Sequence, residues 1–506
     1  MRKWLPLLAV CLGTFMLLID VTIVNVALPA MAIDLHASFT SLEWVIDAYA
    51  LVLAALLLGA GSLSDIFGRR LLYVGGLLVF AAASLASGLA ADGTVLVIAR
   101  GVQGVGGAAM FATTVALLNE AYQGRERGIA YGVWGAVNGA AAATGPILGG
   151  LLTEHLSWRW IFFVNLPISA VAVVLSLLVF SGKHEGHRAR IDVAGMLAFT
   201  ASASLLTYAF IRAGDHGWTA TSTLALIAGG LVALAAFIVI EARITSPLLD
   251  LGLFRDRRFV GAMLVALTFS LSAFAYLAYA SIWLQSVRGL SPVEAGTVFL
   301  PMSVTAFVVS AAIGRRLHGT DPRWIIATGM FLVGIGAFAQ AFLRAGSSWP
   351  SLLIGLFVSG LGVGLVAPTL TSAIMASVPQ QRGGMASGAM NTARQLGFAF
   401  GIAALGTIFQ SRIAHVLGAH SVPRSTSIAA AVSGGQTRAV LAQTPSTFRQ
   451  ALDAAIDTAF ASGLNVILVV SGAIAVATAV AVAILLRPVA APTPEATRAT
   501  DRVSAA

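Results

Sequence analysis

Long apolar segments recur along the whole chain, and they constrain its fold more than any other feature. Each holds about 20 or more residues, enough for an α-helix to cross a hydrocarbon core about 30 Å thick. Of the 506 residues, 58% are hydrophobic and only 10% are charged, whereas a soluble domain carries about 25% charged residues. Such a chain cannot form a water-soluble surface, so we predict that it lies in a lipid bilayer.

The apolar segments predict an all-α membrane protein with fourteen transmembrane helices. Lipid offers no hydrogen-bond partners to open backbone, and continuous apolar runs lack the alternation of barrel strands. The predicted spans lie near residues 7–29, 44–63, 71–91, 94–118, 129–152, 160–180, 193–212, 222–241, 259–284, 294–313, 324–343, 351–374, 385–409 and 461–486.

Two short matches indicate an internal repeat. The sequence GRR follows the second span at 68–70 and the tenth span at 314–316. The pattern GxAxG opens the fifth span at 128–132 and the thirteenth at 384–388. Spans one to six therefore correspond to spans nine to fourteen, and spans seven and eight remain as an inserted hairpin. Two parallel six-helix halves are a common transporter plan, with the substrate site at mid-membrane between them.

These patterns divide the chain into four predicted units. They are an N-terminal six-helix bundle (1–182), an inserted transmembrane hairpin with its linkers (183–257), a C-terminal six-helix bundle (258–487) and a disordered cytoplasmic tail (488–506). The C-terminal bundle includes a long extracytoplasmic loop at 410–460. The spacing of Phe448, Leu452, Ile456 and Phe460 predicts a short interfacial helix that leads into the last span.

The positions of Lys and Arg predict the orientation. Most of them fall in the loops on the side of the two termini, so we expect both termini to be cytoplasmic. We expect a multi-pass protein of the cell inner (plasma) membrane that is a monomer. Basic residues sit between apolar segments and form no continuous stripe, so we expect no nucleic-acid partner. The triplet AMA at 30–32 imitates a signal cleavage site, but Asp20 and Asn25 interrupt the preceding run, so we expect no cleavage.

Four charged residues fall inside predicted spans. Asp20 lies near the middle of span one, Asp47 in the outer part of span two, Arg100 in the outer half of span four and Arg394 near the centre of span thirteen. A charge at the centre of a membrane helix costs about 2.5 to 3.5 kcal/mol on insertion scales. Such residues normally face a cavity or each other, so these four mark candidate functional positions.

Each charge has alternative interpretations. Asp20 either exchanges protons or makes a fixed structural hydrogen bond. Asp47 is a second proton site, a cation-binding acid or an acid facing the outside water. Arg100 either tunes a nearby acid or extends outward to the membrane surface. Arg394, with its neighbours Asn391 and Gln395, lines a cavity or locks span thirteen to another helix.

At this point the chain resembles a known family, the fourteen-helix drug:proton antiporters of the major facilitator superfamily, over residues 1 to about 486. The segments that carry the resemblance are LIDVTIVNVALP (18–29), GSLSDIFGRR (61–70), RGVQGVGGAAM (100–110), GAAAATGPILGG (139–150), SWRWIFFVNLP (157–167) and SGAMNTARQLGFAFGIA (387–403). The resemblance implies a major facilitator fold, and export of amphipathic, often cationic, drugs in exchange for protons. It implies small-molecule substrates, and no cofactor beyond the proton gradient.

The resemblance also assigns roles to residues. Asp20 matches the first-helix acid and is the expected coupling site, with Asp47 as a less secure second one. Arg100, with Gln103, matches the fourth-helix motif and would tune an acid's protonation. The loop 61–70 is the expected conformational latch. Its residues are Gly61, Asp65, Gly68, Arg69 and Arg70, and a plain positive-inside loop, with Asp65 merely capping a helix, is the alternative.

The fifth-helix motif is expected to be a hinge that favours antiport. Its residues are Gly145, Pro146, Gly149 and Gly150, and ordinary tight packing of small residues is the alternative. The candidate substrate cavity is lined by Asn25, Trp44, Gln103, Asn138, Tyr276, Asn391, Arg394 and Gln395.

Several other functions are disfavoured. The segment GVQGVGGA lacks the Lys and Ser or Thr of a phosphate loop and sits in an apolar helix, so ATP is not the expected energy source. The histidines lie in loops or at span ends, and Cys11 stands alone, so we expect no metal site and no enzyme. The remaining alternatives are export of an endogenous lipid, antibiotic or metabolite, and a membrane sensor or scaffold that transports nothing.

Overall fold

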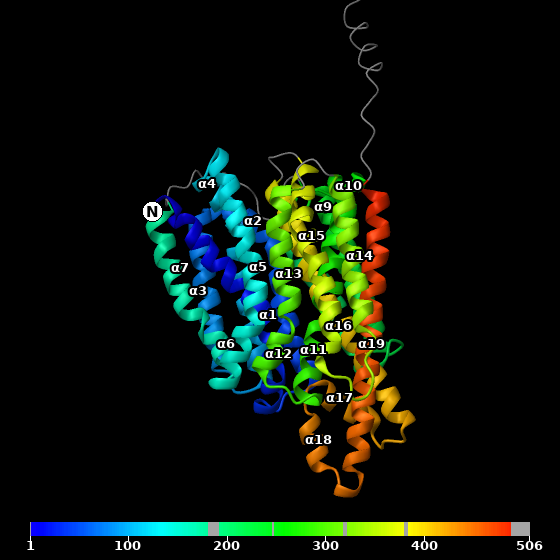
Figure 1. Cartoon of the computed structure of the whole chain (residues 1–506). Helices are drawn as coiled ribbons and strands as arrows, with labels where there is room; N and C mark the ends of the chain where they lie inside the picture. The colour runs from blue at the N-terminus through cyan, green and yellow to red at the C-terminus, as the bar shows by residue number, and fades with distance from the viewer. Residues whose placement is uncertain (1, 181–191, 245–246, 317–320, 379–382, 487–506) are drawn as a thin grey trace, which may run out of the picture.

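The computed structural model describes residues 2–180, 192–244, 247–316, 321–378 and 383–486 (Figure 1). The predicted disordered tail and most of the linker after residue 182 lie outside these ranges. Within the described ranges the chain is helical and contains no strand, which confirms the all-α prediction.

The first half of the chain contains η1 (Arg2–Trp4), α1 (Leu5–Asp34), α2 (Phe39–Phe67), α3 (Arg69–Gly88), α4 (Gly93–Ala121), α5 (Gly124–His155), α6 (Trp160–Phe163), α7 (Asn165–Val179), α8 (Val193–His216), α9 (Thr221–Arg243) and η2 (Leu251–Arg255). The second half contains α10 (Arg257–Ala273), α11 (Tyr276–Ile282), the π-helical turn η3 (Trp283–Val287), α12 (Pro292–Val298), α13 (Leu300–Arg316), α14 (Pro322–Gln340), η4 (Trp349–Leu352), α15 (Leu353–Ala376), α16 (Gly383–Ala419), α17 (Ser425–Ser433), α18 (Thr437–Gln443) and α19 (Ser446–Leu485).

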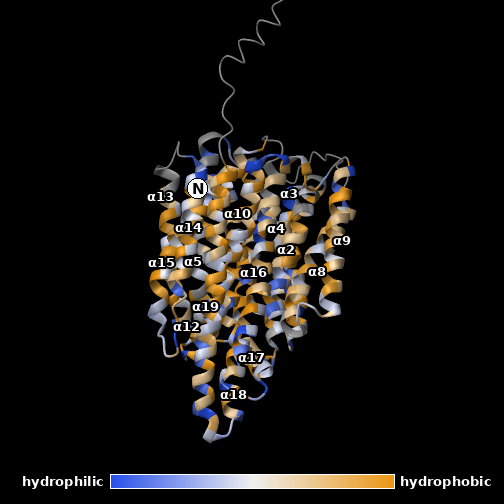
Figure 2. Ribbon diagram, turned by 90° about the vertical axis from the view of Figure 1, so that its right-hand side faces the viewer, coloured by the Kyte–Doolittle hydropathy of each residue, from blue (hydrophilic) through white to orange (hydrophobic). Residues whose placement is uncertain are grey.

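Twelve spans of the described chain are long and apolar enough to cross a membrane. The helices α12 and α13, bent by 41° at their junction, would together form a thirteenth. Figure 2 shows hydrophobic residues along the length of the packed helices and hydrophilic residues gathered toward their ends. The protein is therefore a multi-pass membrane protein with about twelve spanning helices.

The helices form two bundles that stand side by side (Figure 1). Helices α1 to α7 make the N-bundle, and α10 to α16 with α19 make the C-bundle. The end of the molecule that carries η1 and the last residues of α19 is called the terminal end here. The opposite end, which carries α17 and α18, is called the loop end.

The bundles are joined by hydrogen bonds at the loop end. Gln285 Nε2 of η3 donates to the Val26 carbonyl of α1 over 2.9 Å. The backbone N–H of Val293 in α12 donates to Glu154 Oε2 of α5 over 3.1 Å. The Ser291 hydroxyl and that N–H hold the pKa of the exposed Glu154 carboxyl below its ordinary value. The two bundles therefore meet at the loop end in this conformation.

The pair α8 and α9 packs against the seam between the bundles. Ser202 Oγ of α8 donates to the Gly230 carbonyl of α9 over 2.9 Å, which holds the two helices together. Helix α8 also contacts α2 and α16, one helix from each bundle. Thr407 Oγ1 of α16 donates to the Phe210 carbonyl of α8 over 2.9 Å.

Several boundaries differ from the sequence prediction. Helix α2 begins at Phe39 and not near 44, because Ser38 caps it by accepting a hydrogen bond from the N–H of Ser41 over 3.1 Å. The predicted span 259–284 matches one candidate span, Arg257–Val287, although its α-helix is interrupted between the end of α10 at Ala273 and the start of α11 at Tyr276. Hydropathy locates apolar residues and does not detect caps or breaks within them.

The prediction of a short interfacial helix before the last span is wrong. Residues 446–460 are helical, but they are continuous with the last span in α19, which has 40 residues. At 1.5 Å per residue α19 is about 60 Å long, roughly twice the thickness of the hydrocarbon core. No Pro or Gly interrupts the sequence before Gly463, so nothing ends the helix at the membrane surface. Helix α19 projects beyond the loop end beside α17 and α18 (Figure 1).

Helices α3 and α4 approach closely at glycine positions. A Cβ atom on Gly106 would lie 2.6 Å from the backbone N of Phe80 and 2.7 Å from the Gly76 carbonyl. Small residues at such points let membrane helices pack backbone to backbone. The Gly-rich fourth-helix motif therefore has a packing function on this face.

We expect Gly106→Ala to destabilise the protein by about 1 to 3 kcal/mol, because the added methyl group meets backbone atoms that cannot move independently. Gly75→Ala is the matched control, because a Cβ at Gly75 meets no atom within 4 Å. Thermal unfolding in detergent measures the effect. Equal unfolding temperatures for the two variants would show that this contact does not stabilise the bundle.

Candidate functional site

A buried polar network surrounds Asp20 at the middle of α1. The Asp20 side chain is fully buried, and its Oδ2 forms an ion pair with Nη1 of Arg100. Gln103, one turn further along α4, donates from Nε2 to Asp20 Oδ1 over 2.8 Å. The structure thus brings Asp20 of the first-helix motif together with Arg100 and Gln103 of the fourth-helix motif.

Two neutral residues complete this network and were not predicted. Asn165 Nδ2 of α7 donates to Asp20 Oδ1 over 3.2 Å. Ser84 Oγ of α3 accepts from Gln103 Nε2 over 2.9 Å and from Asn165 Nδ2 over 3.2 Å. Both residues are buried. Asn165 lies in the segment SWRWIFFVNLP (157–167) that carries the resemblance, but no role was assigned to it. Ser84 is a polar residue within an apolar run, which is too common to single it out.

Arg100 is fixed by hydrogen bonds, by its ion pair with Asp20 and by contact with an aromatic ring. Its Nε donates to the Val45 carbonyl of α2 over 2.9 Å, and its Nη1 donates to Gln103 Oε1 over 2.8 Å. Its guanidinium carbon lies 4.4 Å from the centre of the Tyr49 ring. Only 1% of the residue is exposed. The interpretation of Arg100 as a side chain that extends to the membrane surface is therefore wrong, and its place beside an acid agrees with the tuning interpretation.

Asp47 is fully buried in α2. Neither of its carboxylate oxygens has a hydrogen-bond partner among the residues that the structure describes. The interpretation of Asp47 as an acid that faces the outside water is wrong for this conformation. A second proton site and a cation-binding acid remain as predictions, because a buried carboxylate is stable only with a proton or a positive partner.

A second buried acid, Glu43, lies one turn before Asp47 on the same face of α2. It is 5% exposed, and its Oε1 lies 3.4 Å from the hydroxyl of Tyr279 in α11 of the C-bundle. Glu43 was not predicted as a site residue because the predicted span began at residue 44. The cap at Ser38 was the signal that would have placed it inside the helix.

The predicted latch is described in part. Gly68 joins α2 to α3 with φ of 92°, a conformation that favours glycine. Arg69 Nη1 lies 3.5 Å from the Ala116 carbonyl and 3.6 Å from Glu120 Oε2 of α4, a partner that was not predicted. The adjacent Arg70 donates from Nη2 to the Leu177 carbonyl over 2.9 Å.

Gly61 and Asp65 are the remaining residues of the predicted latch. A Cβ at Gly61 would meet no atom within 4 Å. The side chain of Asp65 lies outside the described part of the structure. The pairing of Asp65 with Arg69 therefore stays a prediction.

The predicted hinge in α5 is a set of close contacts. A Cβ at Gly145 would collide with Thr22 of α1, and one at Gly149 would lie 2.8 Å from the Ile23 carbonyl. A Cβ at Gly150 would lie 2.6 Å from the Pro292 carbonyl at the start of α12. These glycines pack α5 against α1 and against the other bundle. The Pro146 side chain is outside the described part, and the hinge role stays a prediction.

The predicted cavity residues of the N-bundle are dispersed. Asn25 is 8% exposed, and its Oδ1 has no hydrogen-bond partner among the described residues. Trp44 packs on Tyr208 of α8, with ring centres 5.8 Å apart, and so contacts the α8–α9 pair. The side chain of Asn138 lies outside the described part.

The predicted cavity residues of the C-bundle lie on two helices, α11 and α16. Tyr276 is buried, and its hydroxyl accepts a hydrogen bond from Gln340 Nε2 over 3.3 Å within the same bundle. Asn391 is 9% exposed in α16, and Gln395 is half-buried one turn further along. The guanidinium carbon of Arg394 lies 5.9 Å from the centre of the Phe269 ring, and its Nε has no partner in the described part of the chain.

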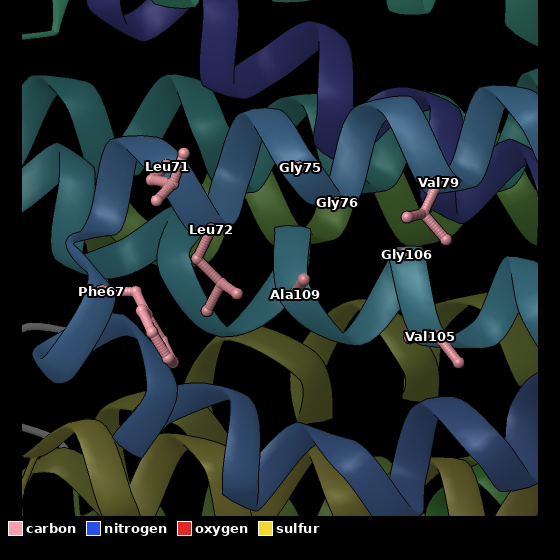
Figure 3. A pocket seen from close by; sticks show the side chains of 9 residues that line it. All are labelled: Phe67, Leu71, Leu72, Gly75, Gly76, Val79, Val105, Gly106 and Ala109. Carbon is pink, nitrogen blue, oxygen red and sulfur yellow. The ribbon is translucent and has the colours of Figure 1, made fainter.

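An apolar groove of about 250 Å³ lies elsewhere, between α3, α4 and the end of α2. Figure 3 shows Phe67, Leu71, Leu72 and Val79 around the glycine positions that form its floor. None of the predicted cavity residues lines it. Its lining is compatible with lipid and gives no polar contact that could orient a substrate.

No group of three or more His, Cys, Asp or Glu side chains that could hold a metal ion occurs among the described residues. The buried polar groups described above are instead positioned around a carboxylate in the membrane. The residue motifs, the helical bundles and this buried ion pair point together to a membrane transporter.

Comparison with known proteins agrees with the conclusion that this is a membrane transporter. The sequence model of the Major Facilitator Superfamily matches residues 10–402. The chain belongs to the major facilitator superfamily. This result confirms the resemblance to the major facilitator superfamily that the motifs indicated.

Two curated members of this superfamily are similar over most of their length. The chain is 35% identical over 417 residues to the multidrug resistance protein Stp of Mycobacterium tuberculosis, covering 82% of this chain and 78% of that protein. It is 32% identical over 483 residues to the tetracenomycin C resistance and export protein of Streptomyces glaucescens, covering 94% and 90%.

A solved structure shows the same fold. It is the inward-facing, unoccupied form of a bacterial homologue of the human lysosomal transporter Spinster. The TM-score is 0.64 at 16% identity, with 96% of this chain and 97% of that chain covered.

We expect Arg100→Ala to destabilise this superfamily member by about 3 to 5 kcal/mol, because it leaves the buried Asp20 carboxylate without its counter-charge. Asp20→Asn combined with Arg100→Gln should cost less than the sum of the two single changes. Lys3→Met is the control for an exposed pair, that with Glu126, and should cost about 1 kcal/mol or less. Thermal unfolding in detergent measures Arg100→Ala, the double variant, its two single variants and Lys3→Met. Strictly additive losses at Asp20 and Arg100 would contradict a coupled ion pair.

Proposed function

We propose that this protein exports amphipathic, often cationic, drugs or toxic compounds in exchange for protons, by alternating access of a site between its two bundles. The observation that carries the proposal is the buried network in which Asp20 pairs with Arg100 and accepts hydrogen bonds from Gln103 and Asn165. The names of the similar proteins, which include multidrug and antibiotic resistance, support drugs as substrates.

The network supports proton exchange for a physical reason. An ionised Asp20 is stable in the bilayer only while Arg100 and its neutral donors stay in contact with it. If a change of conformation separates the helices that carry these groups, the carboxylate gains a proton from the accessible side. Return of the helices releases that proton. One carboxylate can in this way link proton binding to the direction in which the bundles open.

A cationic drug can use the same link. A positive substrate near Asp20 competes with Arg100 and with the proton for one negative charge, which obligatory exchange requires. The proton gradient is then the only energy source, and no cofactor is needed. Transport in this sense is non-covalent, so we propose no enzymatic activity for the chain.

The proposal includes the full membrane arrangement. We propose fourteen spans, in which α5 and the joined α12 and α13 each cross the membrane. The pair α8 and α9 is the inserted hairpin of unit 183–257, between the six-helix units 1–182 and 258–487. Both termini face the cytoplasm, so the loop end faces outside. We propose that the protein acts as a monomer, with the Asp20 network built by α1, α3, α4 and α7 of one bundle.

Export of an endogenous antibiotic is the second candidate. The name of the tetracenomycin C resistance and export protein, similar over 94% of this chain, favours it. Both candidates use the same coupling site and differ only in the substrate. A resistance profile in a host without its own pumps separates a broad drug range from a single compound.

Asp20→Asn keeps the size and hydrogen-bonding capacity of the side chain but cannot exchange a proton. We expect normal membrane insertion and loss of uphill export, with downhill drug flux retained. Drug-dependent proton movement in proteoliposomes under an imposed pH gradient measures this. Asp453→Asn, on an exposed face of α19, is the matched control and should transport normally. Uphill accumulation by Asp20→Asn at the control rate would exclude Asp20 as the coupling acid, and Asp47 would take its place.

The orientation is tested by labelling. In a Cys11→Ala background, we expect Gln123→Cys at the terminal end to resist an impermeant thiol reagent in whole cells, and Ala345→Cys at the loop end to react. Both positions are exposed on the protein surface, so accessibility reports only the side of the membrane. The opposite labelling pattern would invert the proposed topology.

A further inference from the structure

Two buried acids lie side by side at the terminal end of the helices α8 and α9. Asp192 caps the start of α8 and is 1% exposed, and Glu241 lies in the last turn of α9 and is 3% exposed. Figure 2 shows the two helices next to each other at the edge of the molecule. Neither acid belongs to the Asp20 network, and the proposed function gives them no role.

One oxygen of each acid has a backbone donor. Asp192 Oδ1 accepts from the N–H of Gly195 over 2.7 Å, which is the N-cap hydrogen bond of α8. Glu241 Oε2 accepts from the N–H of Leu249 over 3.1 Å. These contacts fix both carboxyl groups, because neither can turn without losing a hydrogen bond.

The other two oxygens face each other. Asp192 Oδ2 and Glu241 Oε1 both lie within 2.8 Å of one point, the position that a Cβ on Gly195 would occupy. The two side chains are within hydrogen-bonding range of each other. Both oxygens are buried, and neither has a hydrogen-bond partner with a fixed proton among the described residues. The glycine at 195 leaves the space in which these oxygens meet.

No cation of the described chain neutralises this contact. Asp192 is the only ionisable side chain in the described ranges that acts on Glu241. Arg243, two residues further along α9, is exposed. The segment after α9 contributes another acid, Asp250, whose side chain caps η2. The two buried oxygens are therefore surrounded by no described positive charge.

One proton would resolve the unfavourable contact. Two adjacent buried carboxylates repel each other, and each oxygen without a donor carries the cost of lost hydration. If one of the acids holds a proton, its O–H donates to the facing oxygen of the other. All four oxygens then take part in hydrogen bonds, and only one negative charge remains.

We propose that Asp192 and Glu241 form a shared-proton site, in which one proton holds the terminal ends of α8 and α9 together. The proton comes from the medium at the terminal end and forms an O–H bond on one of the two acids. Its loss breaks the hydrogen bond between them and leaves two facing carboxylates. No other bond forms or breaks.

The shared-proton site lies between contacts with the two bundles. On the side of α8, Met196 packs against Gly59 of α2, where a Cβ would collide with the methionine side chain. On the side of α9, the N–H of Asp250 donates to Sδ of Met385 in α16 over 3.2 Å. Loss of the proton would therefore loosen α8 from the segment that leads into the C-bundle. This inference goes beyond the proposed function and does not depend on it, since its test requires no transport.

Amide substitutions test whether the site needs exactly one donor. In Glu241→Gln the amide donates to Asp192 Oδ2, and in Asp192→Asn the amide donates to Glu241 Oε1. Each single variant should match the parent protein in thermal unfolding in nanodiscs at about pH 6, above the ordinary range of both acids. The double variant has one N–H too many, however the amides turn. It should lower the ratio of folded to unfolded protein by about 5- to 150-fold.

Infrared spectroscopy detects the proton through the C=O stretch of a neutral carboxyl group. At about pH 6 the parent protein should show the band of one neutral carboxyl that both single variants lack. Raising the pH should remove this band and lower the unfolding temperature of the parent protein, because two facing carboxylates remain. The unfolding temperature of the single variants should not share this fall.

Asp250→Asn is the matched control, because it changes a nearby acid whose side chain accepts a backbone hydrogen bond. It should retain the band. Asp20→Asn should also retain it while losing uphill transport, which separates the shared-proton site from the coupling site. Absence of a difference band between the parent protein and the single variants, or a double variant as stable as the single ones, would overturn the proposal.

Discussion

The buried ion pair of Asp20 and Arg100 is the interaction on which the N-bundle depends. Neither group can remain charged in the bilayer alone, so the helices that carry them must stay in contact. The neutral residues Gln103 and Asn165 satisfy the remaining lone pairs of the carboxylate. This requirement brings α1, α4 and α7 together around one point, and it explains why polar residues occur at these positions in otherwise apolar helices.

Helix α2 connects this network to the other bundle. Its Val45 carbonyl accepts a hydrogen bond from Arg100, Glu43 and Asp47 lie on either side of Val45 in the sequence, and Glu43 contacts Tyr279 of the C-bundle. A movement of Arg100 would therefore act on the segment of α2 that carries both acids. Residues 43–47 of α2 contact Arg100 of the N-bundle and Tyr279 of the C-bundle. This short helical segment therefore couples the Asp20 network to the other bundle.

Much of this arrangement is readable from the sequence, and the exceptions have physical causes. The apolar runs predict helices, and the motifs assign Asp20 and Arg100 to proton coupling and Gln103 to the candidate substrate cavity, but they do not predict that the three residues are in contact. Ser84 was missed because a neutral polar residue costs little in a membrane helix and leaves no clear pattern, whereas Asn165 lies in the motif at 157–167 and was not linked to Asp20 because a motif does not show which helices are neighbours. Glu43 was missed for a different reason, since hydropathy places the start of a span at its first apolar residues whereas a cap begins the helix earlier.

The buried acids Asp20 and Asp47 are held differently in this conformation. Asp20 is paired with Arg100 and accepts hydrogen bonds from Gln103 and Asn165. Neither carboxylate oxygen of Asp47 has a hydrogen-bond partner among the described residues, and a buried carboxyl group without a partner is stable only in its neutral form. Arg100 links the two positions, because it pairs with Asp20 and donates to the Val45 carbonyl, two residues before Asp47 on α2. A displacement of α2 that moved Arg100 away from Asp20 would change the surroundings of both acids at once. An exchanger needs such a link, because proton binding must be coupled to the direction in which the bundles open.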